Sequence, residues 1–398
     1  MFGENNRAWA EIDLDAIENN IRNIRNYVSK DAKILGVVKA DAYGHGYFEV
    51  AETLLKNGAD ILAVACIDEA IQLRHKNITC PILILGQSDI KDAEALIKYD
   101  VIPACFTYSL AEALSTEAKK RNKIAKLHIK VDTGMGRIGF RYTDDENEKK
   151  STIDEILKIS SLENIEINGI FTHFSVADDD DDDYTFFQFS NFTDLCDRLK
   201  QNGLDIKLRH CANSAALIRF PQMHLDMVRP GIILYGLKPS SFVDCSVLGL
   251  KPAMTFKAKI TNIKTIEAGA SVSYGRRFKA DKIKKIATIP VGYADGYTRL
   301  LSGKAEALVC GKLCKIVGNI CMDQCMIDVT DVNNISIGDE AILFGKGENI
   351  ELPVESLSDK LGTINYEILC MVSKRIPRVY YKNGKKVTVV NHLLDSLK

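Results

Sequence analysis

The feature that most constrains this chain is an eightfold alternation of short and long segments in its first 240 residues. Apolar runs rich in β-branched residues alternate there with longer amphipathic segments. The runs are expected to be strands, at Lys33–Lys39, Ile61–Ala65, Ile82–Gly86, Val101–Phe106, Lys126–Asp132, Ile167–Phe174, Ile206–Cys211 and Met227–Tyr235. Nearly continuous apolar strands separated by helices indicate a parallel sheet that is covered on both faces. An open doubly wound sheet also fits this pattern, but the count of eight favours a (β/α)8 TIM-type barrel.

Helical periodicity fills the intervals between these runs. The expected helices are Leu14–Val28, Tyr47–Lys56, Asp68–Lys76, Asp89–Tyr99, Ser109–Arg121, Asp154–Ser160, Phe187–Asn202 and Ser214–Phe220. From Met254 onward short alternating strands and glycine-containing turns predominate, which predicts a mostly-β domain. Its expected strands are Phe256–Thr261, Ala287–Val291, Ala307–Val309, Lys315–Val317, Ala341–Phe344 and Lys386–Val390.

The length of the chain accommodates both parts. A barrel takes about 250 residues, which leaves about 150 for a second domain. We therefore predict an N-terminal (β/α)8 barrel over residues 1–240 and a C-terminal β domain over residues 241–398.

Composition excludes several classes of partner. The 52 basic and 53 acidic residues give a net charge of −1, which does not favour nucleic acid as a partner. The longest apolar runs fall short of the roughly 18 residues of a membrane-spanning helix, and Met1–Arg7 does not resemble a signal peptide. An odd number of cysteines, 11, within mostly apolar segments fits reduced thiols. We therefore expect a cytoplasmic protein that has no membrane partner.

Polar residues at the ends of the predicted strands are the main candidates for chemistry, because barrel active sites lie at the carboxyl ends of the strands. They are Lys39, Arg137, His173, Asn213, Ser214, Arg229 and Gly231. Lys39 is either a strand terminus that reaches solvent or a desolvated amine able to form a Schiff base. Backbone N–H groups near Ser214 and Gly231–Ile232 could bind a phosphate, although Asn213 alone reads better as a helix N-cap.

Three further motifs have a plainer interpretation that we favour. The segment Gly134–Gly139 matches a dinucleotide fingerprint but does not open a helix, and its Arg137 points to anion contact instead. Cys310, Cys314, Cys321 and Cys325 lack zinc-site spacing and are expected to be buried thiols. Six aspartates, Asp178–Asp183, could bind a divalent cation, but such a run usually forms a solvated, self-repelling loop. We expect no metal site.

Lys39 and its flanks, VVKADAYGHG, resemble the pyridoxal-phosphate attachment signature of bacterial alanine racemases. The segments HIKVDTGMGRIG, THFSVAD, ANSAA, MVRPGIILYG, SYGRRF, GYADGY, CMDQ and LGTINYE match the same family in the same order. The resemblance implies a barrel of fold type III with a C-terminal β domain, in a homodimer whose active sites use both chains. It further implies interconversion of L-alanine and D-alanine with pyridoxal 5'-phosphate, supplying D-alanine for peptidoglycan.

The matched motifs also imply a role for each residue. Lys39 would carry the cofactor and act as the base on one face of the substrate, and Tyr274 of the partner subunit would act on the other. The implied cofactor contacts are Tyr43, His173, Asn213, Ser214, Arg229, Gly231, Ile232 and Tyr366. Arg137 and the Met322 backbone would hold the substrate carboxylate. The family carbamylates the lysine that matches Lys130, and its substrate entryway matches Asp178, Tyr293 and Arg299, whereas Asn319 replaces an arginine common in that entryway.

Other activities remain as alternatives. A serine or broad-specificity racemase would share the fold, although Tyr366 and the lack of a membrane segment argue against the membrane-anchored serine type. A fold-type III decarboxylase would be expected to lack the arginine of MVRPGI. A non-catalytic pyridoxal-phosphate-binding regulator would need neither Tyr274 nor a β domain.

Overall fold

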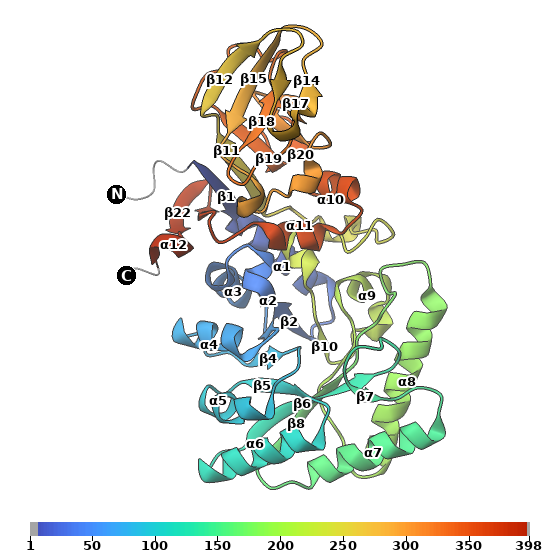
Figure 1. The fold of residues 1–398 in the computed structure, drawn as a ribbon. Coiled ribbons are helices and arrows are strands. Elements are labelled where there is room, and N and C mark those ends of the chain that lie inside the picture. Colours follow the sequence, from blue (N-terminus) through green and yellow to red (C-terminus); the bar gives the residue numbers. More distant parts are fainter. Residues whose placement is uncertain (1–6, 396–398) are drawn as a thin grey trace. The chain divides into compact units, whose positions relative to one another are not determined.

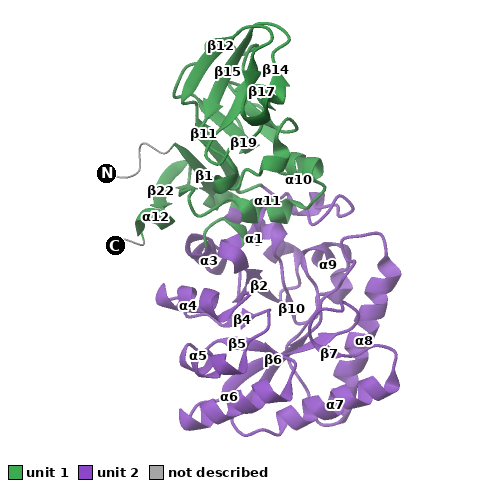
Figure 2. Ribbon diagram, in the orientation of Figure 1, with its two compact units in different colours: residues 1–16, 43–46, 252–398 green, residues 17–42, 47–251 purple. Residues whose placement is uncertain are grey.

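The computed structural model of this protein describes residues 7–395. The chain divides into two compact units, which Figure 2 colours separately. Residues 17–42 and 47–251 form one of them, here the barrel unit, and residues 1–16, 43–46 and 252–398 form the other, here the sheet unit. None of the described helices is long and apolar enough to cross a membrane.

The barrel unit contains eight parallel strands in a nearly closed ring (Figure 1). Their order is β10-β2-β3-β4-β5-β6-β8-β9, and β7 (Phe140–Arg141) pairs with β6. The strands are β2 (Lys33–Val37), β3 (Ile61–Val64), β4 (Ile82–Ile84), β5 (Ile102–Cys105), β6 (Ala125–Asp132), β8 (Ile165–Phe171), β9 (Arg209–His210) and β10 (Met227–Val228). Between β9 and β10, the amide of Asp226 donates to the Arg209 carbonyl at 3.1 Å and that of Arg229 to the Ala212 carbonyl at 2.9 Å. The predicted barrel is confirmed.

Helices follow the strands, as the apolar periodicity predicts, although the helix expected at Asp154–Ser160 begins eight residues earlier, at Glu146. They are α1 (Leu14–Tyr27), α3 (Tyr47–Lys56), α4 (Ile67–His75), α5 (Ala93–Lys98), α6 (Tyr108–Lys120), α7 (Glu146–Ser160), α8 (Asp182–Gln201) and α9 (Ser214–Arg219). In α1, Ile17, Ile21 and Ile24 recur at helical spacing and are all 0% exposed, so one face of this helix is core. The α1 helix begins where the Asp13 carboxylate accepts the amides of Asp15 and Ala16 at 2.9 and 3.1 Å.

Two predicted strands are much shorter in the structure than in the prediction. The prediction Ile206–Cys211 reduces to β9, and Met227–Tyr235 reduces to β10. Pro230 has no N–H for a ladder, and the backbone beyond it forms the 3-10 helix η3 (Ile232–Tyr235). The Tyr235 hydroxyl, which is buried, donates to the Val37 carbonyl at 2.7 Å and so holds η3 to the end of β2.

The aspartate run is exposed for most of its length but is not a free loop. The Asp181 carboxylate accepts the Tyr184 amide at 3.0 Å and so caps α8, which begins five residues earlier than the predicted Phe187. The Asp182 carboxylate forms an ion pair of 2.5 Å with Arg219. Acidic residues in the first turn also complement the helix dipole. The helix cap and the ion pair therefore give two of these aspartates, Asp181 and Asp182, a structural role that needs no bound cation.

The sheet unit is built on one large sheet. Its order is β12-β15-β18-β17-β16-β19-β11-β1-β21-β22, with β20 paired to β19, and β13-β14 form a separate hairpin. The strands are β1 (Ala8–Asp13), β11 (Met254–Lys259), β12 (Asn262–Ile266), β13 (Ser271–Val272), β14 (Phe278–Lys279), β15 (Lys284–Ile289), β16 (Glu306–Val309), β17 (Lys312–Val317), β18 (Cys325–Asp328), β19 (Glu340–Lys346), β20 (Glu351–Leu352), β21 (Arg378–Lys382) and β22 (Lys385–Val390). Short helices α10 (Glu355–Leu361), α11 (Asn365–Met371) and α12 (His392–Asp395) accompany it. The mostly-β prediction is confirmed.

The strand β1 is absent from the sequence prediction. It pairs antiparallel with β11 and parallel with β21, so the first described strand of the chain belongs to the sheet unit. The register places Ala10 opposite Phe256 on one side and Arg378 on the other.

The cap of α8 gives a testable prediction. Substituting Asp181→Ala removes an N-cap acceptor and should lower the free energy of unfolding by about 1 kcal/mol in urea denaturation. The control is Asp180→Ala, which removes one charge from the same run but no helix cap. Equal stabilities of the two variants would contradict this account of the run.

Candidate active site

Lys39 follows β2 directly and opens an unusual turn, α2 (Lys39–Tyr43). Ala40, Asp41 and Ala42 have φ/ψ angles of 53/50°, 55/45° and 53/50°, and Tyr43 has a φ of 51°. This is a left-handed helical turn made without glycine, a conformation that costs roughly 1–2 kcal/mol per residue. The Ala42 amide donates to the Val38 carbonyl at 2.9 Å, within the turn. Backbone strain of this kind is concentrated at functional sites.

Strand ends bring the predicted cations of the barrel unit together. Lys39 follows β2, Arg137 follows β6, and Arg229 follows β10, all at the carboxyl edge of the parallel ring. His173 follows β8 at the same edge, and its pKa is held well below the ordinary value. The first cause is burial, and the next are the charges of Arg229, Arg137, Lys130 and Lys39, in decreasing order. The imidazole of His173 is therefore neutral at physiological pH, within a group of cations.

Arg229 makes four hydrogen-bond contacts at this edge of the barrel. Its side chain is buried, at 4% exposed, and burial lowers its pKa to about 10, so it remains charged at neutral pH. One nitrogen, Nη2, donates to the carbonyls of Thr172 at 2.8 Å and Cys211 at 3.0 Å. The same Nη2 lies 3.1 Å from Nδ1 of His173, so one of its two hydrogens is shared between acceptors, and Nη1 lies 3.1 Å from Nδ1 of His210.

These contacts determine the tautomers of the histidines. A guanidinium can only donate, so Nδ1 of both His173 and His210 must accept, and each ring carries its proton on Nε2. The Nε2–H of His210 then donates to Nδ1 of His128, 3.0 Å away in the barrel interior. Burial is the main cause that lowers the pKa of His128 to about 4, and it holds that of His210 well below its ordinary value. The interior of the barrel thus contains neutral imidazoles and one guanidinium.

Lys130 projects from β6 into the same region. It is 2% exposed, and its Nζ donates to the Val131 carbonyl at 2.5 Å. Burial, followed by the charge of Arg229, lowers its pKa to about 7, against the partial opposition of Asp132. A large fraction of this amine is therefore unprotonated near neutral pH.

The residues that follow β9 and β10 interlock. Ser214 is buried, and its Oγ accepts the Gly231 amide at 2.8 Å. The Asn213 side chain accepts the Ala216 amide at 2.9 Å, so it caps α9 as the plainer interpretation of the sequence has it. The Asp178 carbonyl accepts a hydrogen bond from Ser240, on a neighbouring loop.

Two of the predicted residues meet within the sheet unit. The rings of Tyr43 and Tyr366 lie 5.9 Å apart between centroids, at an angle of 46°. Burial, and then the Cys370 thiol, raise the pKa of Tyr43 well above its ordinary value. The phenol of Tyr43 is therefore a hydrogen-bonding group rather than a base in this environment.

A third set of predicted residues clusters on the surface of the sheet unit. Tyr274, Tyr293 and Met322 are 71%, 42% and 53% exposed. The backbones of Tyr293 and Met322 adjoin, since the amides of Tyr293 and Ala294 donate to the carbonyls of Cys321 and Met322, both at 3.0 Å. Ser302 connects Arg299 to the segment that contains Met322. The Ser302 hydroxyl donates to the Arg299 carbonyl, and its oxygen accepts the Ile320 amide at 2.9 Å. We call Tyr274, Tyr293, Arg299 and Met322 the exposed cluster.

Asn319 holds Tyr274 in this cluster. It is only 5% exposed, and its Nδ2 donates to the Tyr274 carbonyl at 2.6 Å. In return Ser273 Oγ donates to the Asn319 carbonyl at 2.6 Å. Ser273 has a φ of 67°, so these reciprocal bonds stabilise a strained backbone. The sequence comparison assigned Asn319 only to the entryway, because a contact with a residue 45 positions away leaves no local signal.

Two family models together match most of this chain. Residues 12–239 match the family described as "Alanine racemase, N-terminal domain", and residues 253–380 match "Alanine racemase, C-terminal domain". The chain belongs to the alanine racemase family. It is 47% identical to alanine racemase 1 of Clostridium acetobutylicum over 393 residues, covering 99% of this chain and 100% of the relative. It is 48% identical to the alanine racemase of Clostridium tetani over 394 residues, with coverage of 99% and 100%.

Solved structures of alanine racemases agree in fold. That of Clostridium difficile 630 superposes with a TM-score of 0.93 at 42% identity, covering 98% of this chain and 100% of that one. The structure from Bacillus anthracis with bound L-Ala-P gives 0.90 at 37% identity, with coverage of 99% and 100%. The predicted family and fold class are confirmed, and the protein is an isomerase of the racemase type.

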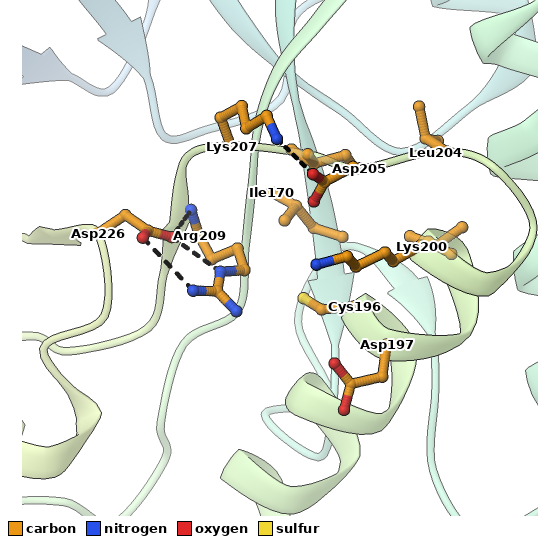
Figure 3. Close-up of a pocket in the computed structure, with 11 residues that line it drawn as sticks. Ile170, Cys196, Asp197, Lys200, Leu204, Asp205, Lys207, Arg209 and Asp226 are labelled. Carbon is orange, nitrogen blue, oxygen red and sulfur yellow. Dashed lines mark hydrogen bonds and ion pairs between the residues drawn. The ribbon is translucent and has the colours of Figure 1, made fainter.

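Not every concavity or reactive group belongs to the alanine racemase site. A pocket of about 260 Å³ in the barrel unit contains none of the predicted site residues (Figure 3). Arg209 donates to Asp226 at 2.8 and 3.4 Å on its wall, and Lys207 pairs with Asp205. Ion pairs thus satisfy much of the charge that lines it.

The cysteine prediction needs one correction. All the cysteines are free, and Cys314 and Cys325 are buried as expected, but Cys321 is half-buried and Cys310 is exposed. Cys310 lies in the tight turn between β16 and β17 with a φ of 47°, which directs it away from the sheet core. Within residues 7–395, no group of three or more His, Cys, Asp or Glu side chains could hold a metal ion.

The lowered pKa of Lys130 gives a prediction with a defined sign. The folded chain releases this proton near pH 7, whereas the unfolded chain retains it to about pH 10. The free energy of unfolding of the wild type, relative to Lys130→Met, should therefore rise with pH across this window, by at most about 1.4 kcal/mol per pH unit. Urea denaturation in carbon-dioxide-free buffers measures it. A difference between the two proteins that is constant with pH would contradict the lowered pKa.

The contact of Asn319 gives a second prediction. In Asn319→Asp an oxygen replaces the donor that faces the Tyr274 carbonyl, which should cost about 1–3 kcal/mol of unfolding free energy. The matched control is Asn334→Asp at an exposed turn, where a few tenths of a kcal/mol is expected. If both variants unfold at the same urea concentration, Asn319 does not anchor the Tyr274 loop.

Proposed function

We propose that this protein interconverts L-alanine and D-alanine with pyridoxal 5'-phosphate, and supplies D-alanine for peptidoglycan in the cytoplasm. The observation that carries this is the carboxyl edge of the barrel, where Lys39, Arg137 and Arg229 surround a neutral His173. Family membership supports the reaction. The printed names of the relatives favour alanine over the alternative of serine or a broad range of amino acids.

The residues at this edge fit the cofactor. A phosphate dianion and a substrate carboxylate both suit a site with several cations. Arg229 can donate to a pyridine nitrogen but does not readily release a proton, so it would leave that nitrogen unprotonated and limit side reactions such as transamination. When bound, pyridoxal phosphate would supply the electron sink for the charge that develops at Cα.

Each predicted residue has a place in this proposal. Lys39 would attach the cofactor through its amine. His173 and Asn213 would support the cofactor surroundings, while the phosphate would be held by Tyr43, Ser214, Gly231, Ile232 and Tyr366. Arg137 and the backbone of Met322 would bind the substrate carboxylate, and Asp178, Tyr293 and Arg299 would line the entryway.

Racemisation needs a proton removed from one face of Cα and a proton delivered to the other. Lys39 would serve one face and Tyr274 of the partner subunit the other. A phenol with an ordinary pKa near 10 is a poor base, so cations must favour its deprotonated form. Because Arg229 donates to Nδ1 of His173, the Nε2–H of His173 is left to donate to a phenolate.

A homodimer follows from the same assignment. Tyr274 and Met322 are among the large hydrophobic side chains that are exposed in the single chain. Exposed apolar clusters of this kind mark interaction surfaces. We propose that the exposed cluster faces the barrel of a second copy and completes its active site.

Lys130 is proposed to carry a carbamate. Its neutral amine would attack the carbon of CO2, forming an N–C bond and releasing one proton to solvent. The product is an anion, which would pair with Arg137 and relieve the repulsion among the cations of the site.

Hydrogen exchange at Cα tests the two-base assignment. Lys39→Ala should abolish racemisation, measured by a coupled assay on L-alanine and D-alanine, with L-serine as the competing substrate. Tyr274→Phe should slow solvent-deuterium exchange of one alanine enantiomer by at least about 100-fold, and of the other much less, as loss of one acid–base group predicts. Tyr99→Phe, outside the site, is the control. Equal slowing of exchange for both enantiomers would contradict the proposal.

A further inference from the structure

Glu69 lies at the mouth of the barrel and has no part in the chemistry proposed above. It is half-buried in the first turn of α4, the helix that follows β3. Its two carboxylate oxygens accept from two different strand ends. Oε1 accepts the Ala40 amide at 2.6 Å, and Oε2 accepts the Ala65 amide at 2.7 Å. Both distances are at the short end for charge-assisted hydrogen bonds.

These two amides need an acceptor because the β2–β3 ladder has ended. The last register pair is Val37 with Ala63, and the last ladder bond runs from the Val38 amide to the Ala63 carbonyl at 2.9 Å. Beyond it, β2 enters the left-handed turn and the two backbones no longer run side by side. Both amides lie at exposed positions, and one carboxylate supplies an acceptor for each strand end, which ties the two ends together.

The turn that Glu69 holds is also the one that presents Lys39. Ala40 is the first left-handed residue and directly follows Lys39. Three alanine or aspartate residues in this region cost several kcal/mol together, so the turn persists only where surrounding contacts fix it. Asp41 supplies one such contact farther along, where its Oδ1 accepts the Tyr47 amide at 2.9 Å. Glu69 supplies a contact at Ala40, the residue next to the lysine.

We propose that Glu69 is a positioning residue for Lys39, which fixes the left-handed turn so that the lysine amine points at its reaction partner. This inference rests on the proposed role of Lys39 as the cofactor-binding lysine. The proposed role requires both carboxylate oxygens of Glu69 to act as acceptors, so the substitution Glu69→Gln tests it directly. The amide keeps the size of the side chain but turns one acceptor into a donor that faces a backbone N–H.

The experiment uses protein stripped of pyridoxal phosphate and then exposed to it. Borohydride traps the product, and mass spectrometry measures the rate of labelling at Lys39. Glu69→Gln should slow this labelling by at least about tenfold, because one of the two backbone amides would face a donor in place of an acceptor. The control Asp68→Asn removes one charge from the neighbouring exposed position of the same helix turn and should stay within about twofold.

A rescue and a second readout separate positioning from a general loss of structure. Glycine adopts the left-handed region at no steric cost, so adding Ala40→Gly to Glu69→Gln should restore part of the labelling rate. Amide hydrogen exchange at Ala40 should be at least about tenfold faster in Glu69→Gln than in the wild type, because that amide has lost its acceptor.

The outcomes divide cleanly. Unchanged labelling and exchange in Glu69→Gln would overturn the inference, and so would equal losses in Glu69→Gln and Asp68→Asn. Labelling of wild-type protein at a lysine other than Lys39 would instead overturn the proposed function. In that event the exchange rate at Ala40 still decides whether Glu69 holds the turn.

Discussion

The buried guanidinium of Arg229 is the interaction on which the rest of the barrel edge depends. A buried charge is tolerated only when its donors are satisfied, and Arg229 uses them on the carbonyls that follow β8 and β9 and on two imidazoles. The side chain itself follows β10. It therefore ties three strand ends together at the place where the β9–β10 ladder is missing.

The same charge sets the chemistry around it. It forces both Nδ1 atoms of His173 and His210 to accept, and it contributes to the lowered pKa of each imidazole and of Lys130. On the neighbouring strands β2 and β3, the edge is fixed by a carboxylate instead, since Glu69 holds the strained turn after Lys39. In the proposed reaction, the Arg229 guanidinium and the Glu69 carboxylate have the same purpose. They fix the positions of the anion-binding region and of the Lys39 amine, so that neither has to reorganise during the reaction.

The sequence predicts the elements whose stability is local. The apolar strands β2, β3, β4, β5, β6 and β8 lie within a few residues of their predicted bounds, because each is a continuous apolar run between clear helical patterns, whereas the two-residue β7 is absent from the prediction. The strand β1 escapes prediction because its partners, β11 and β21, come from the far end of the chain. The motifs identify Lys39, Arg229 and Tyr274, whereas the contacts of Glu69 and Asn319 are set by tertiary structure. Nothing in Ala40–Ala42 signals a left-handed turn, since such turns normally carry glycine.

Nitrogen-15 NMR of the histidine rings tests the central claim most directly. The chain has seven histidines, and single substitutions of His173 and His210 to glutamine assign their signals in the selectively labelled holoenzyme. The arrangement around Arg229 predicts that both rings are neutral at pH 6 and carry the proton on Nε2. A doubly protonated ring at pH 6, or a proton on Nδ1 of either residue, would contradict it.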